Sequence, residues 1–142
     1  MAVIIGKKML KDTGQYEDYA IGITLPIQIG NTAFNQAFTT IEQAKSNIKN
    51  LLLTNRGERI MQPQFGSGLK ELLFNFNDNK LETDIEDTIV NSLEYWLPYV
   101  IVDDIVIEQT DDNRDSNIVY VSIRFKISGM PQLETVTFKV KA

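Results

Sequence analysis

The spacing of apolar side chains changes along the chain and separates an amino-terminal segment from the rest. Between residues 20 and 29, isoleucine and leucine occupy every second position, which is typical of extended chain. Because Pro26 has no backbone N–H, this segment is expected at a sheet edge or outside a sheet. Gly30 and Asn31 then break the pattern. Residues 1–37 are predicted to form an extended arm, laid over the domain or over a neighbour.

Apolar residues at helical spacing then predict two long helices with a short one between them. The first begins at Thr39, where Thr39 and Glu42 match a capping box, and ends near Asn55 or Gly57. The short helix is expected over about 68–74 and the second long one over about 80–97, where Pro98 stops it. The apolar stripes are Ile41, Ala44, Ile48, Leu51, Leu52, Leu69, Leu72, Leu73, Leu81, Ile85, Ile89, Leu93, Trp96 and Leu97.

The last third of the chain returns to a period of two. Strands are predicted over residues 102–108 and 118–127, and Val136, Phe138 and Val140 alternate with threonine and lysine in a third. Short links between successive strands favour an antiparallel meander. Helices followed by strands predict one α+β domain over residues 38–142, with the helices packed on the apolar face of a small C-terminal antiparallel sheet.

Composition narrows the classes of partner. The chain has 142 residues, of which 43% are hydrophobic and 23% charged, as in ordinary soluble globular proteins. Its net charge of −5 argues against extensive phosphate binding, so no nucleic acid is expected as a partner, although a local basic patch is compatible with it. No segment has the length and apolarity of a bilayer span, and the amino terminus lacks the charge order of a signal peptide, so no membrane is expected either.

The absence of cysteine and histidine limits the chemistry. Ser-His and Cys-His catalytic arrangements and most zinc sites are excluded, and a cysteine-free chain suits a reducing compartment. Asp111, Asn113 and Asp115 resemble the start of a calcium loop, but Ser116 replaces its glycine and Ser122 its bidentate glutamate. We interpret residues 110–117 as a solvated hairpin loop and expect neither metal nor cofactor.

A carboxylate pair remains the one enzymatic alternative. A glycoside hydrolase needs two carboxylates facing each other across a sugar-binding cleft, separated by about 5–10 Å. No spacing singles out a pair in this sequence, and no cluster of sugar-stacking aromatic residues lies nearby. The candidates are Glu58, Glu71, Asp78, Glu82 and Asp84.

The most distinctive stretch lies between the first two predicted helices. It contains Arg56-Gly57-Glu58-Arg59 and then Pro63, Phe65 and Gly66. Local structure accounts for part of it, since Gly57 suits a left-handed helix end and Glu58 can pair with a neighbouring arginine. Pro63 and Gly66 suit a turn before the next helix. These roles do not explain why all of these residues coincide in one loop.

The same stretch resembles a known family, the small wedge protein of contractile phage baseplates, which is similar in turn to a baseplate subunit of type VI secretion systems. Its members share a helix ending in a basic residue, then R-G-E/S-R, P-x-F/I-G and a leucine-rich helix. The resemblance covers about residues 38–140. The matching positions are Arg56, Gly57, Glu58, Arg59, Pro63, Phe65, Gly66, Leu69, Leu72 and Leu73.

This resemblance implies structural work without catalysis or a cofactor. Family members sit on a core bundle of larger wedge proteins and offer their terminal strands to extensions of the first sheath ring. Strand addition of this kind gives affinity without a deep pocket. The implied partners are the larger wedge proteins, the tail sheath subunit, and other small wedge or tube-proximal proteins. The implied location is the tail baseplate of a virion assembled in the bacterial cytoplasm.

One family feature is altered here. Many members carry Glu-Pro-Arg after the long helix as a contact for the wedge core, whereas this chain has Leu97-Pro98-Tyr99. Docking at this place is therefore expected to be apolar and aromatic.

Some relatives are labelled lysozyme-like, so a peptidoglycan hydrolase is kept as the alternative function. An adaptor outside any phage particle is a third possibility. The expected protein-binding residues are Arg56, Gly57, Glu58, Arg59, Pro63, Phe65, Gly66, Trp96, Leu97, Pro98, Tyr99, Arg124, Val136, Phe138 and Val140.

Overall fold

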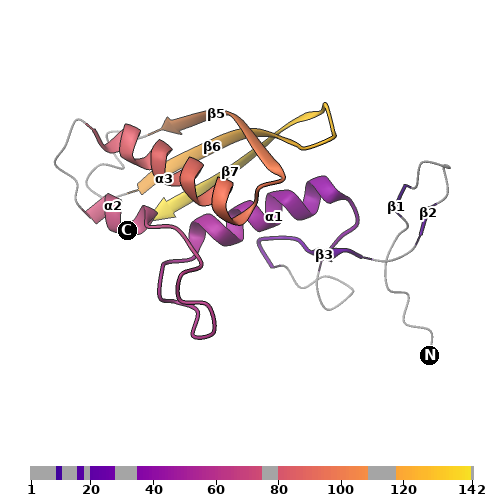
Figure 1. The fold of residues 1–142 in the computed structure, drawn as a ribbon, viewed down its shortest axis with the longest axis horizontal. Helices are drawn as coiled ribbons and strands as arrows, with labels where there is room; N and C mark the ends of the chain where they lie inside the picture. Colours follow the sequence, from indigo (N-terminus) through magenta and orange to yellow (C-terminus); the bar gives the residue numbers. More distant parts are fainter. Residues whose placement is uncertain are drawn as a thin grey trace. The chain divides into compact units, whose positions relative to one another are not determined.

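The computed structural model describes residues 9–10, 16–17, 20–27, 35–74, 80–108 and 118–141 (Figure 1). The chain forms two compact units, residues 1–47 and residues 48–142, and each is treated separately. The calcium-like loop with Asp111, Asn113 and Asp115, the break at Gly30 and the candidate carboxylate Asp78 lie outside the described residues.

The described residues of the first unit include four strands of two residues each. β1 (Met9–Leu10) pairs with β2 (Tyr16–Glu17), and β3 (Gly22–Ile23) pairs with β4 (Gln36–Ala37), both antiparallel. Of the alternating segment expected over residues 20–29, the structure describes residues 20–27, and within these it places Gly22 and Ile23 in a sheet. Its isoleucines at 21, 23 and 27 are exposed.

α1 (Thr40–Leu53) begins at the predicted capping box. The Glu42 amide donates to Thr39 Oγ1 at 3.2 Å, and Glu42 Oε2 accepts the Thr39 amide at 3.3 Å. These two reciprocal bonds satisfy backbone amides that have no partner inside the helix. In the same unit the Leu25 amide donates to Ser46 Oγ at 3.2 Å, which attaches the arm to the first half of α1.

The second unit confirms the predicted α+β fold. It contains α2 (Leu69–Phe74) and α3 (Leu81–Trp96), followed by β5 (Val100–Glu108), β6 (Ile118–Ile127) and β7 (Leu133–Lys141). The three strands form one antiparallel sheet in the order β5-β6-β7, as expected for a meander. β5 begins two residues before the predicted position, directly after the turn at Pro98.

The core of this unit lies between the helices and one face of the sheet. α3 contacts β5, α2 contacts both α3 and β7, and β6 runs between the two outer strands (Figure 1). Each fully buried aliphatic or aromatic side chain contributes about 1.5–3 kcal/mol through removal of apolar surface from water. The buried hydrophobic residues on the helices and strands of this unit are Ile48, Leu51, Leu52, Leu69, Leu73, Ile85, Ile89, Leu93, Val100, Val119, Val121, Ile123, Phe125, Ile127, Val136, Phe138 and Val140.

The two outer strands differ in regularity. β7 pairs with β6 without interruption from Leu133 to Lys141. β5 pairs with β6 through a register shift between Val102 and Asp104, which places the extra residue Asp103 in the strand. A bulge of this kind bends a strand and disfavours further pairing along its free side.

Candidate protein-binding surface

The loop of residues 54–67 between α1 and α2 is closed at its base. The Ser67 amide donates to the Thr54 carbonyl at 3.0 Å, and the buried Ser67 hydroxyl donates to the Leu52 carbonyl at the end of α1 at 2.7 Å. Further along, the Gly57 amide donates to the Pro63 carbonyl at 2.7 Å. These bonds join residues far apart in the loop and therefore fix its conformation.

Two glycines with positive φ make this closure possible. Gly57 has φ +83° and lies in open space, since no atom is within 4 Å of where a Cβ would be. Gly66 has φ +121°, and a Cβ there would lie 2.5 Å from the Thr54 carbonyl oxygen. Gly57 is therefore needed only for its backbone conformation, whereas Gly66 also allows two segments of backbone to approach each other.

Arg59 holds the loop against α1. Its Nη2 donates to Asn50 Oδ1 at 3.0 Å, and its guanidinium carbon lies 3.9 Å from the centre of the Phe65 ring. A guanidinium over an aromatic face is an attractive arrangement. The arginine thus links the helix end, the middle of the loop and the loop's aromatic residue.

Glu58 has a different partner from the expected one. Its carboxylate accepts the backbone amide of Asn55 at 2.7 Å, within the turn that follows α1, instead of pairing with a neighbouring arginine. The reason is local: Asn55 has just left the helix, and its amide lies within reach of a side chain three residues later. Arg56 is exposed.

An aromatic cluster joins the loop to the C-terminal end of α3. The Phe65 and Trp96 rings meet edge to face with centroids 5.2 Å apart, and Trp96 meets Tyr95 in the same way at 5.0 Å. Such pairs are worth about 0.5–1.5 kcal/mol beyond their buried area. Beside them is a shallow depression of about 460 Å³, lined by Arg56, Pro63, Gln64, Gly66, Asn91, Ser92, Tyr95 and Trp96.

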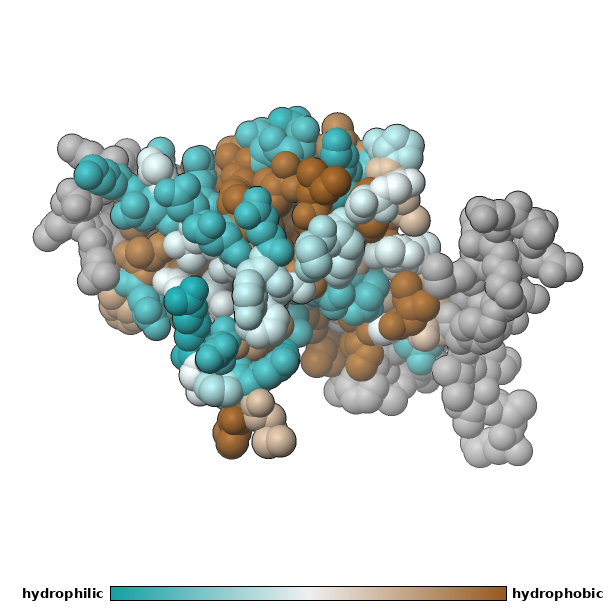
Figure 2. All heavy atoms as spheres, viewed as in Figure 1, coloured by the Kyte–Doolittle hydropathy of each residue, from teal (hydrophilic) through white to brown (hydrophobic). Residues whose placement is uncertain are grey.

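The tip of the loop is apolar and exposed. Ile60 is 95% and Met61 94% solvent-accessible, and Figure 2 shows this tip projecting beyond the hydrophilic residues at the loop's base. The periodic patterns did not identify these two residues. The available signal was two adjacent apolar residues in a polar loop with no helical or strand-spaced neighbours to pack with.

The Leu97-Pro98-Tyr99 segment forms the turn between α3 and β5. The Leu97 amide donates to the Leu93 carbonyl at 2.8 Å, and the Val100 amide donates back to the Leu97 carbonyl at 2.9 Å. Pro98 is exposed in the turn, and Leu97 and Tyr99 are half-buried. Of the residues expected to dock at this place, Trp96 belongs to the aromatic cluster and the other three to the turn.

The expected protein-binding residues of the sheet lie on β6 and β7, apart from the loop and the turn. Arg124 is exposed on β6 and forms ion pairs with Asp103 at 3.3 Å and Asp104 at 2.6 Å. The side chains at positions 136, 138 and 140 on β7 are at most 7% exposed, because they face the helices. Any contact that these three residues make with another protein would therefore use the main chain of β7.

The four candidate carboxylates among the described residues come from the loop and two different helices. Glu58 is on the loop, Glu71 on α2, and Glu82 and Asp84 on the first turn of α3; none of the four lines either depression identified on the second unit. The described residues contain no cluster of three acidic side chains positioned for a metal ion. Among the same residues, no helix has both the length and the apolarity needed to cross a membrane.

The site thus consists of a loop with a defined shape, an exposed apolar tip and an adjoining aromatic cluster. The family model for the baseplate wedge protein gp25 matches residues 40–132, and the chain belongs to this family. Membership assigns it a structural role in a baseplate, with other baseplate proteins as its partners. The matched range includes the loop, the aromatic cluster and most of the sheet.

Solved structures share the fold at low sequence identity. A candidate tail lysozyme from Geobacter sulfurreducens aligns with a TM-score of 0.63 at 19% identity, over 72% of this chain and 91% of that one. The baseplate of the anti-feeding prophage gives 0.55 at 18%, over 84% and 82%. The type VI secretion baseplate complex gives 0.55 at 12%, over 71% and 92%. No curated protein sequence matches the chain significantly.

Proposed function

We propose that this chain is the baseplate wedge component that docks on larger wedge proteins through the loop of residues 54–67 and starts the sheath by strand addition at β7. The observation that carries the proposal is the loop itself. It is closed by backbone bonds, fixed by Arg59 and Phe65, and exposes two apolar side chains to solvent. A preorganised apolar projection loses little conformational entropy on binding.

The surroundings of the tip support a protein partner. Arg56, Glu58, Gln62 and Gln64 are exposed around it. Two apolar side chains inside a polar margin have the composition of an interface centre with its rim. The aromatic cluster at Tyr95 and Trp96 extends the same surface, because its depression is lined by the loop and by α3 together.

The sheet supports strand addition on one side. β7 is an outer strand with nine uninterrupted residue pairs to β6, so its free side is straight enough to pair. β5, the other outer strand, carries the bulge and the acidic pair Asp103 and Asp104. Lysines at 139 and 141 point outward from β7, and charge on an edge keeps it from pairing indiscriminately.

Hydrogen exchange tests the assignment to β7. In an outer strand, every second backbone amide points away from the paired strand and has no partner within the sheet. About half of the β7 amides are therefore expected to exchange fast in the free protein. Addition of the purified sheath subunit of the same machine should slow these amides by at least roughly tenfold, while β5 amides are unchanged. Protection along β5, or no protection on β7 when the subunits co-elute, would contradict this assignment.

Truncation before β7 is not a usable test. It would remove Val136, Phe138 and Val140 from the core, where each is at most 7% exposed. Loss of large buried side chains costs about 2–5 kcal/mol each, so the truncated chain would fail to fold whatever its role. Exchange on the intact chain avoids this ambiguity.

Replacement of Arg59 by alanine tests the loop. It removes the bond to Asn50 and the contact with Phe65, and is expected to lower the free energy of unfolding by about 1–2 kcal/mol, which leaves a folded protein. Incorporation into baseplates is expected to fail, because the loop is no longer fixed. Urea unfolding and gradient sedimentation of assembled baseplates measure the two effects. Normal incorporation of the folded variant would refute this role of the loop.

A further inference from the structure

The sheet is less well covered along β5 than along β6 and β7. The register places Val102 opposite Phe125 and Ile105 opposite Ile123, so both residues lie on the helix-facing side. Phe125 and Ile123 are fully buried, whereas Val102 and Ile105 are only half-buried. The helices therefore leave apolar surface of the sheet accessible on this strand.

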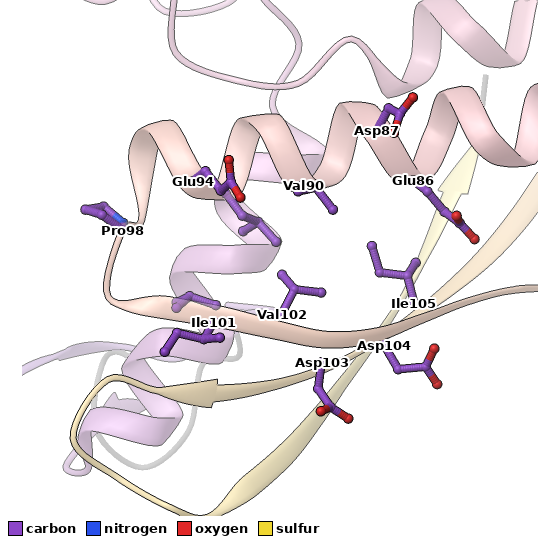
Figure 3. A pocket seen from close by; sticks show the side chains of 12 residues that line it. Glu86, Asp87, Val90, Glu94, Pro98, Ile101, Val102, Asp103, Asp104 and Ile105 are labelled. Atoms are coloured by element: carbon purple, nitrogen blue, oxygen red, sulfur yellow. The ribbon is translucent and has the colours of Figure 1, made fainter.

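Because the helices do not fully cover β5, a groove of about 630 Å³ remains beside this strand (Figure 3). It runs between α3 and β5, with Pro98 at one end. In Figure 3 the side chains of Val90 on α3 and of Val102 and Ile105 on β5 point toward one another across it. Figure 2 shows apolar surface bordered by hydrophilic residues where these two elements adjoin. The volume is sufficient for several apolar side chains from another molecule.

The margin of the groove is acidic. Figure 3 shows Glu86 extending from α3 toward β5; Glu94 of the same helix also lines the groove, and Asp103 and Asp104 lie on the strand. No lysine or arginine lines the groove. Arg124 pairs with the two aspartates from the opposite face of the sheet, so the uncompensated charge is on the α3 side. α3 as a whole has five acidic residues and no basic one.

We propose that the groove between α3 and β5 binds a basic amphipathic helix of a neighbouring baseplate protein. Apolar side chains of that helix would cover Val90, Val102 and Ile105, and its lysines or arginines would face Glu86 and Glu94. These two glutamates are eight residues apart, or about 12 Å along the helix axis, which corresponds to two turns of a partner helix. That the partner is a baseplate protein rests on the proposed function. That the partner is a basic amphipathic helix rests only on the residues of the groove.

A helix fits this groove better than a strand does. A strand would have to pair with the free edge of β5, where the bulge at Asp103 interrupts the hydrogen-bonding pattern. A helix needs no main-chain partner, because it binds through side chains that fill the space between two elements. It is also a distinct surface from the loop tip, since Ile60 and Met61 do not line the groove.

Binding of a synthetic helix to the intact chain tests the proposal. The probe is a labelled 16-residue peptide with leucines along one face and lysines beside them, and the measurement is fluorescence anisotropy at two salt concentrations. We expect binding by the native chain, weakened by salt. We expect at least about tenfold weaker binding by Glu86→Lys/Glu94→Lys, because both rim charges then repel the peptide.

The matched control is Glu82→Lys/Asp84→Lys, which makes the same change of net charge on the same helix outside the groove. It is expected to change binding less than threefold. Equal weakening by both variants, or equal affinity for a peptide with glutamates in place of the lysines, would overturn the proposal. So would the absence of any binding by the native chain to the lysine peptide.

Peptide binding and incorporation into baseplates can be measured separately on the same variants. A chain that binds the peptide in its groove but does not enter baseplates would refute the proposed function alone. A chain that enters baseplates normally as Glu86→Lys/Glu94→Lys would refute the groove as a baseplate contact and leave docking through the loop intact.

Discussion

Gly66→Ala is expected to lower the free energy of unfolding by about 3 kcal/mol, whereas Gly57→Ala lowers it by only about 1 kcal/mol. Both glycines have positive φ, at +121° and +83°, where an L side chain is strained by about 1–3 kcal/mol. Only at Gly66 would the added Cβ also lie 2.5 Å from a backbone oxygen, that of Thr54. A carbonyl held by its own hydrogen bond to Ser67 has little room to move.

Urea unfolding of the two variants measures this difference, because the chemical change is identical and only the surroundings differ. If Gly66→Ala has the smaller effect, the approach between residues 54 and 66 is looser than the structure indicates. We also expect Gly66→Ala to expose Ser67 and raise the exchange rate of its amide, since that amide closes the base of the loop.

Ile60→Ser/Met61→Ser is expected to leave stability unchanged and to weaken binding to the wedge proteins by at least about a hundredfold. Both side chains are about 95% exposed in the free chain, so their removal changes the free energy of unfolding by less than about 0.5 kcal/mol. In a complex, burial of each such side chain contributes about 1.5–3 kcal/mol, and about 1.4 kcal/mol corresponds to a factor of ten in affinity. Calorimetric titration with the purified wedge core measures the loss.

The control for this variant is Gln62→Ser/Gln64→Ser, which shortens two exposed polar side chains of the same loop. It is expected to bind within about threefold of the native chain, because rim residues contribute little energy. Similar affinity of the Ile60/Met61 variant and this control would show that the tip is not the contact.

The sequence predicts the elements well because their signals are local. The capping box at Thr39 and Glu42 places the start of α1, and Pro98 places the end of α3. The alternation from residue 118 to 127 predicts both the strand and the side that is buried. In each case the residues that determine the structure lie within a few positions of one another.

The candidate site is less predictable because it depends on distant contacts. The resemblance to a family singles out the loop, but it does not show that Ile60 and Met61 project, which follows from closure by Ser67 and Leu52. The meeting of Phe65 with Trp96 joins positions 31 residues apart. The pairing of Glu58 was wrong in the sequence interpretation, since a backbone amide competes with the arginines for its carboxylate.

The groove has no signal in the sequence. Val102 and Ile105 read as ordinary core positions of a strand, and their partial exposure depends on how far α3 extends over the sheet. Whether an apolar residue on an outer strand is covered is a property of packing, not of the alternation along the strand.

The bulge at Asp103 also limits how copies of the free protein can associate with one another. If two copies pair through β7, both straight edges are consumed, and only the bulged, acidic β5 edges face outward. Self-association through the β5-β6-β7 sheet would then stop at a dimer and could not grow into a ribbon. The asymmetry between the two edges thus protects a chain that waits for its partners from polymerising into fibrils.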